Sequence, residues 1–377
     1  MKKNESLQGK GNKFTKKFFC AAINGRGETI TQDAENIEGF KDIVSKAAVA
    51  WLDIRTDDPF SEGKFAVLNL GLSETLLSSV LGGGVSAYED FDEEVGIVLP
   101  AIHVRNLTIQ SDPLIIFIRE NFVVTIHASH MERFLQLRRY AEIFLKKISR
   151  NIPVEDKLTL VLVRIIDENN SRNFEKLREI EEASDKLNEW LMNPETPVAK
   201  IGPEIHKIKH ALMVYLRLIW ATGDVLNDLR YGDSKLISDN RGVLDQISTL
   251  AQSITGHVAL TEHLSNIVTS GLEILQSIYN NQLQEFNNRL ALLIGYLTII
   301  GTAVLVPNTL GTILSGSAFN LTKGDLFWYL PLLVFSTIAS TYGVYVWVKR
   351  KGLLTQKVPQ VHYKIHHKRE TEGKQKK

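Results

Sequence analysis

Hydroxyl side chains recur at helical spacing near the C-terminal end of the chain. Thr298, Thr302, Leu305, Thr309, Thr312 and Gly316, which we call the threonine stripe, follow the positions i, i+4, i+7, i+11, i+14 and i+18 of one helix face. Their oxygens suit the water shell of a hydrated cation, because Mg²⁺ keeps several bound waters in proteins. The same pattern of small and hydroxylated residues also favours close helix packing in lipid. Pore lining and helix packing are therefore both open.

The stripe lies inside an uncharged run that is long enough to cross a membrane. This run extends from Leu290 to Leu314, and a second one extends from Leu326 to Val348. Each covers a hydrocarbon core of roughly 30 Å when it is helical. We therefore expect a two-helix membrane hairpin. On the pore-lining interpretation, Asn308 adds an amide beside the stripe, and Ile294 and Leu297 would form an apolar constriction.

The positive charges around the two spans predict their orientation. Lys349 to Lys351 follow the second span and Arg289 precedes the first, whereas the loop between them carries only Lys323 and Asp325. The basic segment 1–17 lacks the apolar region of a secretory signal. We expect a multi-pass protein of the cell membrane with both termini in the cytoplasm and the loop facing outward.

Composition excludes several classes of function. The chain has 377 residues and a net charge of +1, which gives no support for a nucleic-acid partner. Its single cysteine, Cys20, excludes a disulfide framework within the chain. The sequence contains no metalloprotease, nucleophile-elbow, phosphate-loop or dinucleotide motif. We expect no enzyme and no cofactor.

The region 18–130 alternates short β-like and helical segments, which predicts an α/β/α sandwich. The expected strands are Phe18 to Ile23, Ala48 to Ile54, Val95 to Arg105, Pro113 to Arg119 and Phe122 to Ala128. The expected helices are Gly39 to Ala47 and Ser73 to Leu81, the second with Ser73 as its N-cap.

From residue 131 onward the pattern is helical. Helices are expected at Met131 to Ser149, Glu155 to Met192 and Pro203 to Tyr231, and a last one starts near Ser238 and continues without proline until Pro307. At about 1.5 Å per residue, the last helix would be on the order of 100 Å long. It carries a heptad pattern, which favours packing against copies of itself or against the preceding helices. The heptad positions are Ile247, Ile254, Thr261, Val268 and Leu275 on one row and Leu250, Leu264 and Ile278 on the next.

These patterns together predict an α+β membrane protein. Its expected parts are a basic N-terminus (1–17), a cytoplasmic α/β domain (18–130), a helical bundle with a stalk helix (131–288), a transmembrane hairpin (289–349) with an outer loop (315–325), and a basic tail (350–377).

At Leu297 to Pro307, LTIIGTAVLVP followed by Asn308 and Thr309, the chain resembles the first transmembrane helix of the CorA family of divalent-cation transporters. The order of the parts also resembles that family, including the Trp51-Leu52-Asp53 strand, the FVVTIH strand and the basic Lys349 to Leu353 segment. The resemblance implies a homopentamer in the lipid membrane, with five copies of the first span around a central pore. It implies Mg²⁺ as the substrate less directly, with Co²⁺, Ni²⁺ and Zn²⁺ as alternatives.

The chain departs from that family at the outer mouth. Where the family has a Gly-Met-Asn signature, this chain reads Gly316-Ser317-Ala318-Phe319. Gly316, Ser317 and Asn320 are the candidates that replace the polar role of the signature. The residues expected to line the pore itself are Ile294, Leu297, Thr298, Thr302, Leu305, Asn308, Thr309 and Thr312.

The acidic run Tyr88 to Glu94 has two interpretations. Glu89, Asp90 and Asp92 either bind a regulatory divalent cation between subunits, as acidic cytoplasmic residues do in the resembled family, or they form a solvated turn before a strand.

The sequence leaves three functions open. The first is a divalent-cation transporter, and the second is a non-conducting membrane sensor or scaffold of the same architecture. The third is a membrane-bound enzyme, which a ligand-sized pocket with clustered acids in the α/β domain would favour.

Overall fold

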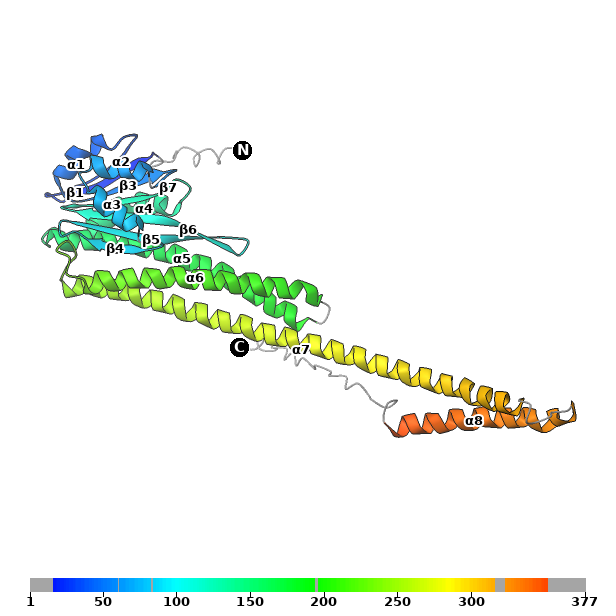
Figure 1. Cartoon of the computed structure of the whole chain (residues 1–377). Coiled ribbons are helices and arrows are strands. Elements are labelled where there is room, and N and C mark those ends of the chain that lie inside the picture. The colour runs from blue at the N-terminus through cyan, green and yellow to red at the C-terminus, as the bar shows by residue number, and fades with distance from the viewer. Residues whose placement is uncertain (1–15, 60, 83, 194–195, 316–322, 352–377) are drawn as a thin grey trace, which may run out of the picture. The chain divides into compact units, whose positions relative to one another are not determined.

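A computed structural model describes residues 16–59, 61–82, 84–193, 196–315 and 323–351 (Figure 1). The chain divides into two units, Met1–Leu275 and Gln276–Lys377. The longest helix, α7 (Arg241–Leu314), has 74 residues and belongs to both units. Each unit is described by itself.

The N-terminal unit contains a seven-stranded sheet in the order β2-β1-β3-β7-β6-β5-β4. The strands are β1 (Phe18–Asn24), β2 (Thr29–Ala34), β3 (Ala47–Thr56), β4 (Ala87–Asp90), β5 (Glu94–Arg105), β6 (Thr108–Arg119) and β7 (Phe122–Ala128). Only β3 and β7 pair in parallel, and the other neighbours are antiparallel. This parallel pair lies at the centre of the sheet.

The sheet is covered on both faces, which confirms the α/β/α arrangement (Figure 1). Successive residues of β3 show why, because a strand points alternate side chains to opposite faces. Trp51 joins the core beneath the long helices, whereas Leu52 joins the core beneath the short ones. The short helices are η1 (Glu38–Phe40), α1 (Lys41–Ser45), α2 (Ser61–Asn69) and α3 (Glu74–Gly82). The long ones are α4 (Arg133–Lys147), α5 (Val154–Met192), α6 (Val198–Tyr231) and the first part of α7.

Several elements differ from the sequence expectation. The strands β2 and β4 and the helix α2 were not predicted, and the helix expected at Gly39 to Ala47 is two short helical turns that end at Ser45. Helix α6 starts at Val198 and passes through Pro203, because a proline within the first turns of a helix removes few backbone hydrogen bonds. Ser73 acts as predicted, since its Oγ accepts a hydrogen bond from the amide of Leu76.

The heptad residues of α7 from Ile247 to Leu275 are buried, whereas Ile278 is half-buried. Within the N-terminal unit they pack against the preceding helices. Ile254 lies against Gly223 of α6, and Leu191 of α5 approaches Gly271 so closely that a side chain there would meet it. Of the two expected packing modes, the single chain therefore shows packing of α7 against the preceding helices.

A buried charge cluster ties the sheet centre to α4. Asp53 of β3 is fully buried, and its Oδ2 accepts a 2.6 Å hydrogen bond from Nε of Arg138, which is also buried. Its Oδ1 accepts the hydroxyl hydrogen of Thr125 and lies 3.2 Å from Nε2 of His127, both on β7. Burial alone would raise the pKa of Asp53, but His127, Arg138 and the hydrogen bonds outweigh burial and hold it well below its ordinary value.

Replacing Arg138→Met should lower the free energy of unfolding by about 3–5 kcal/mol, because it leaves the buried Asp53 carboxylate without its partner. Folding lowers the pKa of Asp53, so the stabilisation is present above the ordinary carboxyl range and is lost as the pH falls through the lowered value. The difference in free energy of unfolding between the parent protein and the variant should therefore become smaller at acidic pH. Denaturant unfolding of the full-length protein in detergent, followed by tryptophan fluorescence, measures it.

The matched control is Lys146→Met on the same helix. Lys146 pairs with Glu142 at 2.5 Å, but both side chains are exposed. An exposed pair contributes about 0.5 kcal/mol or less, so this variant should unfold like the parent. Equal stability of the two variants would contradict the role given to the buried cluster.

Candidate functional site

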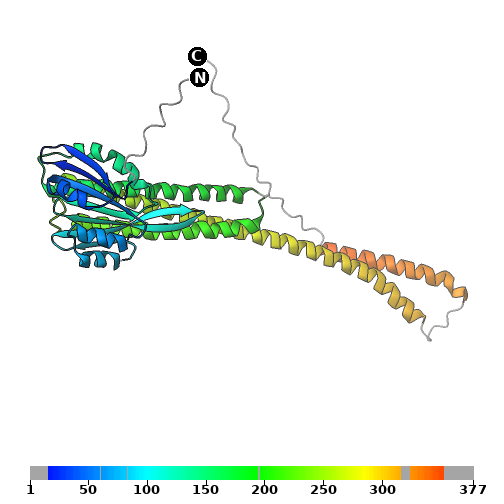
Figure 2. The same ribbon diagram turned by 90° about the horizontal axis from the view of Figure 1, so that it is seen from above.

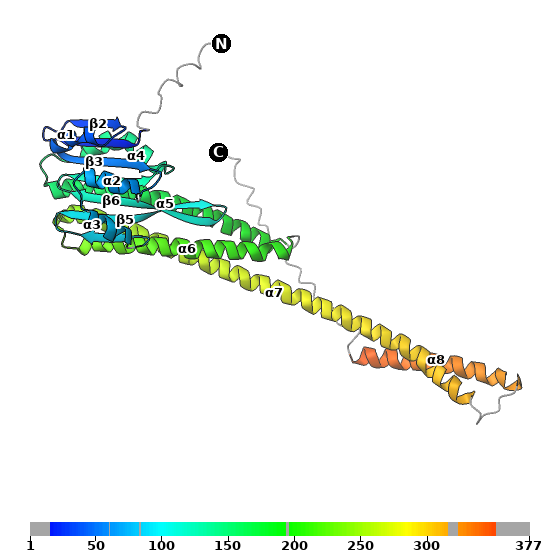
Figure 3. The same ribbon diagram turned by 45° about the horizontal axis from the view of Figure 1, so that its top comes forward.

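The C-terminal unit contains two apolar helices that bury little of their surface within the chain. They are the end of α7, from residue 276, and α8 (Leu326–Arg350). Both α7 and α8 are long and apolar enough to cross a membrane, and 6% of the most apolar window of each is buried. Such helices need lipid or other protein chains around them. Figures 2 and 3 both show α8 lying beside the end of α7.

Two glycines of α7 lie close to α8. A Cβ at Gly295 would lie 3.8 Å from a methyl of Val348, and a Cβ at Gly311 would lie 3.3 Å from the hydroxyl of Tyr329. These contacts lie at opposite ends of the hairpin, so the two helices stay close along its length. Small residues that allow this approach are typical of helix pairs in membranes.

The threonine stripe lies largely on another side of α7. Thr302 is half-buried, whereas the other described residues expected to line a pore are exposed: Ile294, Leu297, Thr298, Leu305, Asn308, Thr309 and Thr312. Packing against α8 in the same chain therefore does not account for most of the stripe. Gly316, Ser317 and Asn320 lie outside the described residues.

The threonine hydroxyls donate their hydrogens to carbonyls of their own helix. Thr298 donates to Ile294 at 2.9 Å and Thr312 donates to Asn308 at 2.8 Å. Thr302 and Thr309 each reach carbonyls three and four residues earlier. A hydroxyl oxygen has two acceptor positions in addition to its one donor hydrogen. The stripe thus offers acceptors on its outer side, which is what the water molecules around a cation require.

Gly301 belongs to the same exposed side and was missed by the sequence reasoning. It lies three residues after Thr298 and four before Leu305, and a Cβ at this position would meet nothing within 4 Å. Its position in the stripe could have been found from the spacing alone. A lone glycine between threonines carries little chemical signal.

The acidic run forms the end of β4 and a turn into β5. Asp90 and Asp92 are exposed, Glu89 is half-buried, and Asp92 lies 3.4 Å from Nζ of Lys235. Asp90 accepts a hydrogen bond from the amide of Asp92, which has a positive φ of 63°. The turn is therefore present, and a cation site between subunits stays a prediction.

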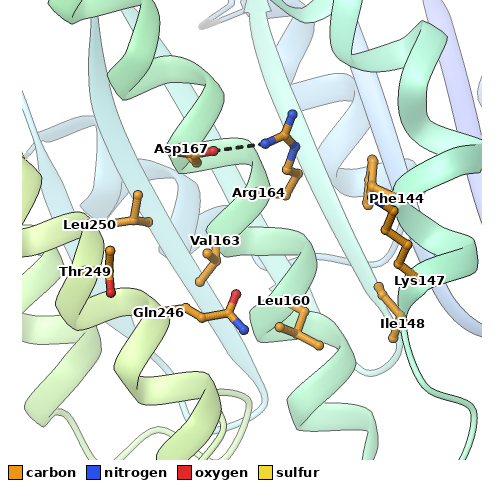
Figure 4. A pocket seen from close by; sticks show the side chains of 10 residues that line it. All are labelled: Phe144, Lys147, Ile148, Leu160, Val163, Arg164, Asp167, Gln246, Thr249 and Leu250. Carbon is orange, nitrogen blue, oxygen red and sulfur yellow. Dashed lines mark hydrogen bonds and ion pairs between the residues drawn. The ribbon is translucent and has the colours of Figure 1, made fainter.

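A groove of about 410 Å³ lies between α4, α5 and α7 in the N-terminal unit (Figure 4). Phe144, Leu160 and Val163 give it an apolar lining. Asp167 is the one acid among the described residues that line it, and it forms an ion pair with Arg164 at 3.0 Å. The groove lies outside the α/β domain (18–130), so it does not test the enzyme interpretation.

One group of possible metal ligands occurs among the described residues. It consists of His103, Asp112 and His130, whose ligand atoms all lie within 4.8 Å of one another. The sequence reasoning missed it because the three residues come from different elements with no motif spacing. Burial, with Arg133 nearby, lowers the pKa of His103 below its ordinary value.

Comparison with known proteins covers nearly the whole chain. A family model described as "CorA-like Mg2+ transporter protein" matches residues 46–350. The complete structure of the CorA magnesium transporter from Methanocaldococcus jannaschii matches with a TM-score of 0.65 and 16% identity, over 89% of this chain and 98% of that chain. No curated protein matches the chain.

Two further solved structures share the fold. The full-length CmaX protein matches with a TM-score of 0.53 and 18% identity, over 89% of this chain and 98% of that chain. The ZntB cytoplasmic domain from Vibrio parahaemolyticus RIMD 2210633 matches with a TM-score of 0.51 and 15% identity, over 70% of this chain and 98% of that chain. At these identities the structures establish the fold alone.

Replacing Gly311→Leu should destabilise the hairpin, because the new side chain must displace Tyr329. Overpacking of this kind costs about 1–3 kcal/mol. The measurement is the thermal unfolding midpoint of the purified protein in detergent. The control is Gly343→Leu on α8, where a Cβ meets nothing within 4 Å of the same chain. A midpoint unchanged by Gly311→Leu would show that the close approach is not needed.

Proposed function

The chain belongs to the CorA-like Mg²⁺ transporter family, whose members are transporters of divalent cations, and on this premise we propose that it conducts a divalent cation across the cell membrane. The route is the centre of a homopentamer, lined by the membrane part of α7. Mg²⁺ is the first candidate, and Co²⁺, Ni²⁺ and Zn²⁺ are the alternatives. Both termini lie in the cytoplasm, as the basic residues after α8 indicate.

The observation that carries this proposal is the exposure of the threonine stripe in the single chain. Thr298, Thr309 and Thr312 are exposed in the single chain, and Asn308 adds an exposed amide beside them. Around a shared axis these groups would face water, whereas facing lipid they would have no solvent partner. Lining an aqueous path is therefore the role that best explains the exposed polar side of α7.

The stripe suits an ion that moves with its water shell. Mg²⁺ gives up its water reluctantly, so a pore for it requires acceptors for water hydrogens rather than carboxylates that replace the water. The hydroxyls supply these acceptors because their hydrogens are already donated to backbone carbonyls. Ile294 and Leu297 give an exposed apolar segment before the stripe, which supports a constriction that closes the pore by excluding water.

A regulatory role for the acidic run remains part of this proposal. Glu89, Asp90 and Asp92 do not form a group of ligands within the single chain, so a cation there requires residues of a second subunit.

The alternative function is a non-conducting sensor or scaffold with the same architecture. It is favoured by one specific observation, which is the absence of the Gly-Met-Asn signature at Gly316 to Ala318. The two functions differ in one measurement. Purified protein in liposomes that contain a metal-sensitive dye should admit Mg²⁺ or one of the alternative cations. An intact oligomer that admits none of the four would leave the scaffold as the function.

Replacing Thr309→Leu should reduce cation flux nearly to that of protein-free liposomes, because every subunit then loses a hydroxyl acceptor and adds an apolar side chain to the path. Thr309→Ser, which keeps the hydroxyl, should retain most of the flux. Size-exclusion chromatography in detergent should show the same oligomer for both variants.

The matched control for this change is Val304→Leu. Val304 is exposed on α7 but lies outside the threonine stripe, and the change adds one methylene group there. It should leave the flux unaltered. If Thr309→Leu conducts as well as Val304→Leu, the stripe serves packing rather than conduction.

A further inference from the structure

Three chain segments of the N-terminal unit bring metal-ligating atoms to one point. His103 lies near the end of β5, Asp112 lies on β6, and His130 lies in the loop between β7 and α4. The membrane part of the chain does not contribute to this cluster. Ion binding at this cluster is therefore a separate matter from what the hairpin conducts.

The β5–β6 hairpin fixes the first two ligands. Asn106 and Leu107 form its turn with φ values of 52° and 62°, as expected for a two-residue turn of the I′ type. This turn sets the register, in which His103 pairs with Gln110 and Ala101 pairs with Asp112. His103 and Asp112 are therefore diagonal neighbours on the same face of the sheet.

Backbone contacts hold the third ligand and the end of β5. The amide of Met131 donates to the carbonyl of Ala128 at 3.0 Å, which closes the turn that carries His130. The amide of Ile102, next to His103, donates to Oδ1 of Asn173 on α5 at 2.8 Å. Ligands on such supported backbone are held in place before any ion binds.

The distances match those around a shared ion. Oδ2 of Asp112 lies 3.0 Å from Nε2 of His103 and 2.8 Å from Nε2 of His130. Two atoms that bind one metal at about 2.0–2.2 Å, with bond angles of about 90–110°, lie roughly 2.8–3.6 Å apart, so both distances fall at the short end of this range. Both imidazole nitrogens thus converge on the same carboxylate oxygen.

The nitrogen of His103 has no well-directed partner. Its Nε2 is shielded from solvent, and its contact with Asp112 lacks the geometry of a hydrogen bond. A buried polar atom without such a bond is costly unless another group satisfies it. The side chains remain reachable, since His103 and Asp112 are each 30% exposed and His130 is 65% exposed. A metal ion would satisfy Nε2 and keep solvent on its open side.

We propose that His103, Asp112 and His130 form a binding site for a transition-metal cation of the Zn²⁺ class. Nε2 of both histidines and Oδ2 of Asp112 are its protein ligands, and solvent fills the remaining positions. Two imidazoles and one carboxylate suit Zn²⁺, Co²⁺ or Ni²⁺. Mg²⁺ prefers oxygen ligands, so it binds here poorly.

The charges around the site favour the same class of ion. Asp112 supplies one negative charge, while Arg133 and Lys176 are the cations that act on His103. The guanidinium of Arg133 donates to the carbonyl of Ile102 and to the side-chain oxygens of Asn169 and Asn173, and it also interacts with the carboxylates of Asp112, Glu168 and Glu175. The negative charge of Asp112 is thus partly offset by Arg133, so an ion held mainly by charge gains little at this site. An ion held by coordinate bonds to imidazole still binds.

The test uses the full-length protein in detergent after treatment with a chelator. Zn²⁺ binding is measured by competition with a chromophoric chelator, and Co²⁺ serves as a spectroscopic probe through its visible d–d bands. The parent should bind Zn²⁺ at this site, and excess Mg²⁺ should not displace it. His130→Ala and Asp112→Asn should each weaken that binding at least about tenfold and remove the Co²⁺ bands.

The control variant is His206→Ala with His210→Ala. These exposed histidines lie one turn apart on α6, with ring centroids 6.5 Å apart, and form a competing pair. Removing them should leave the Zn²⁺ site and the Co²⁺ bands unchanged. Loss of binding in this control alone, or full binding in both His130→Ala and Asp112→Asn, would overturn the proposal. Displacement of Zn²⁺ by an equal concentration of Mg²⁺ would overturn the choice of ion.

A folding readout separates ligand loss from damage to the protein. Bound Zn²⁺ should raise the thermal unfolding midpoint of the parent, because a ligand that binds the folded state stabilises it. His130→Ala should unfold at the same temperature as the metal-free parent, since the side chain is exposed, and should lose the Zn²⁺-dependent increase. An increase of parental size in this variant would contradict the site.

Discussion

A membrane offers no partner to an unsatisfied backbone group, and this constraint decides the form of the C-terminal unit. It requires both spans to be helices, and α7 and α8 are helical along their apolar lengths. It also explains how the helix carries hydroxyls, because each threonine of the stripe donates to a carbonyl of its own helix. Pro307 is the exception, since it has no amide hydrogen for the carbonyl of Ala303. The helix nevertheless continues to Leu314.

The N-terminal unit instead has to accommodate charged side chains that are buried between the layers of its α/β/α sandwich. Asp53 and Arg138 satisfy each other at the sheet centre, and Arg133 is held by oxygens of Ile102, Asn169 and Asn173. Both clusters connect the sheet to helices on the same face. Hydrophobic contacts alone would tolerate a shifted register between these layers, whereas directed bonds to buried charges do not. We regard them as the contacts that specify how the helices sit on the sheet.

The sequence predicts those parts of the fold whose patterns are local and long. The two spans, the long helices and the strand Phe122–Ala128 follow from unbroken runs of apolar or periodic residues. The sequence fails to predict segments whose secondary structure depends on pairing with a neighbouring strand. Thr108 to Asp112 is polar and ends before Pro113, yet it is a strand because Pro113 faces Pro100 in the ladder, so the two missing amides coincide. Asp112 was therefore not placed on a strand, and its meeting with His103 and His130 could not be seen.

The two candidate cation sites recognise different properties of an ion. As the proposed pore wall, the threonine stripe would offer hydroxyl acceptors to a water shell and would distinguish ions by the size and charge of their hydrated form. His103, Asp112 and His130 require that water leaves, so they distinguish ions by affinity for imidazole. Mg²⁺ satisfies the first requirement and fails the second, whereas Zn²⁺ and Co²⁺ satisfy the second. A chain with both sites can therefore conduct one cation while it binds another, and identical selectivity at the two sites is not expected from their chemistry.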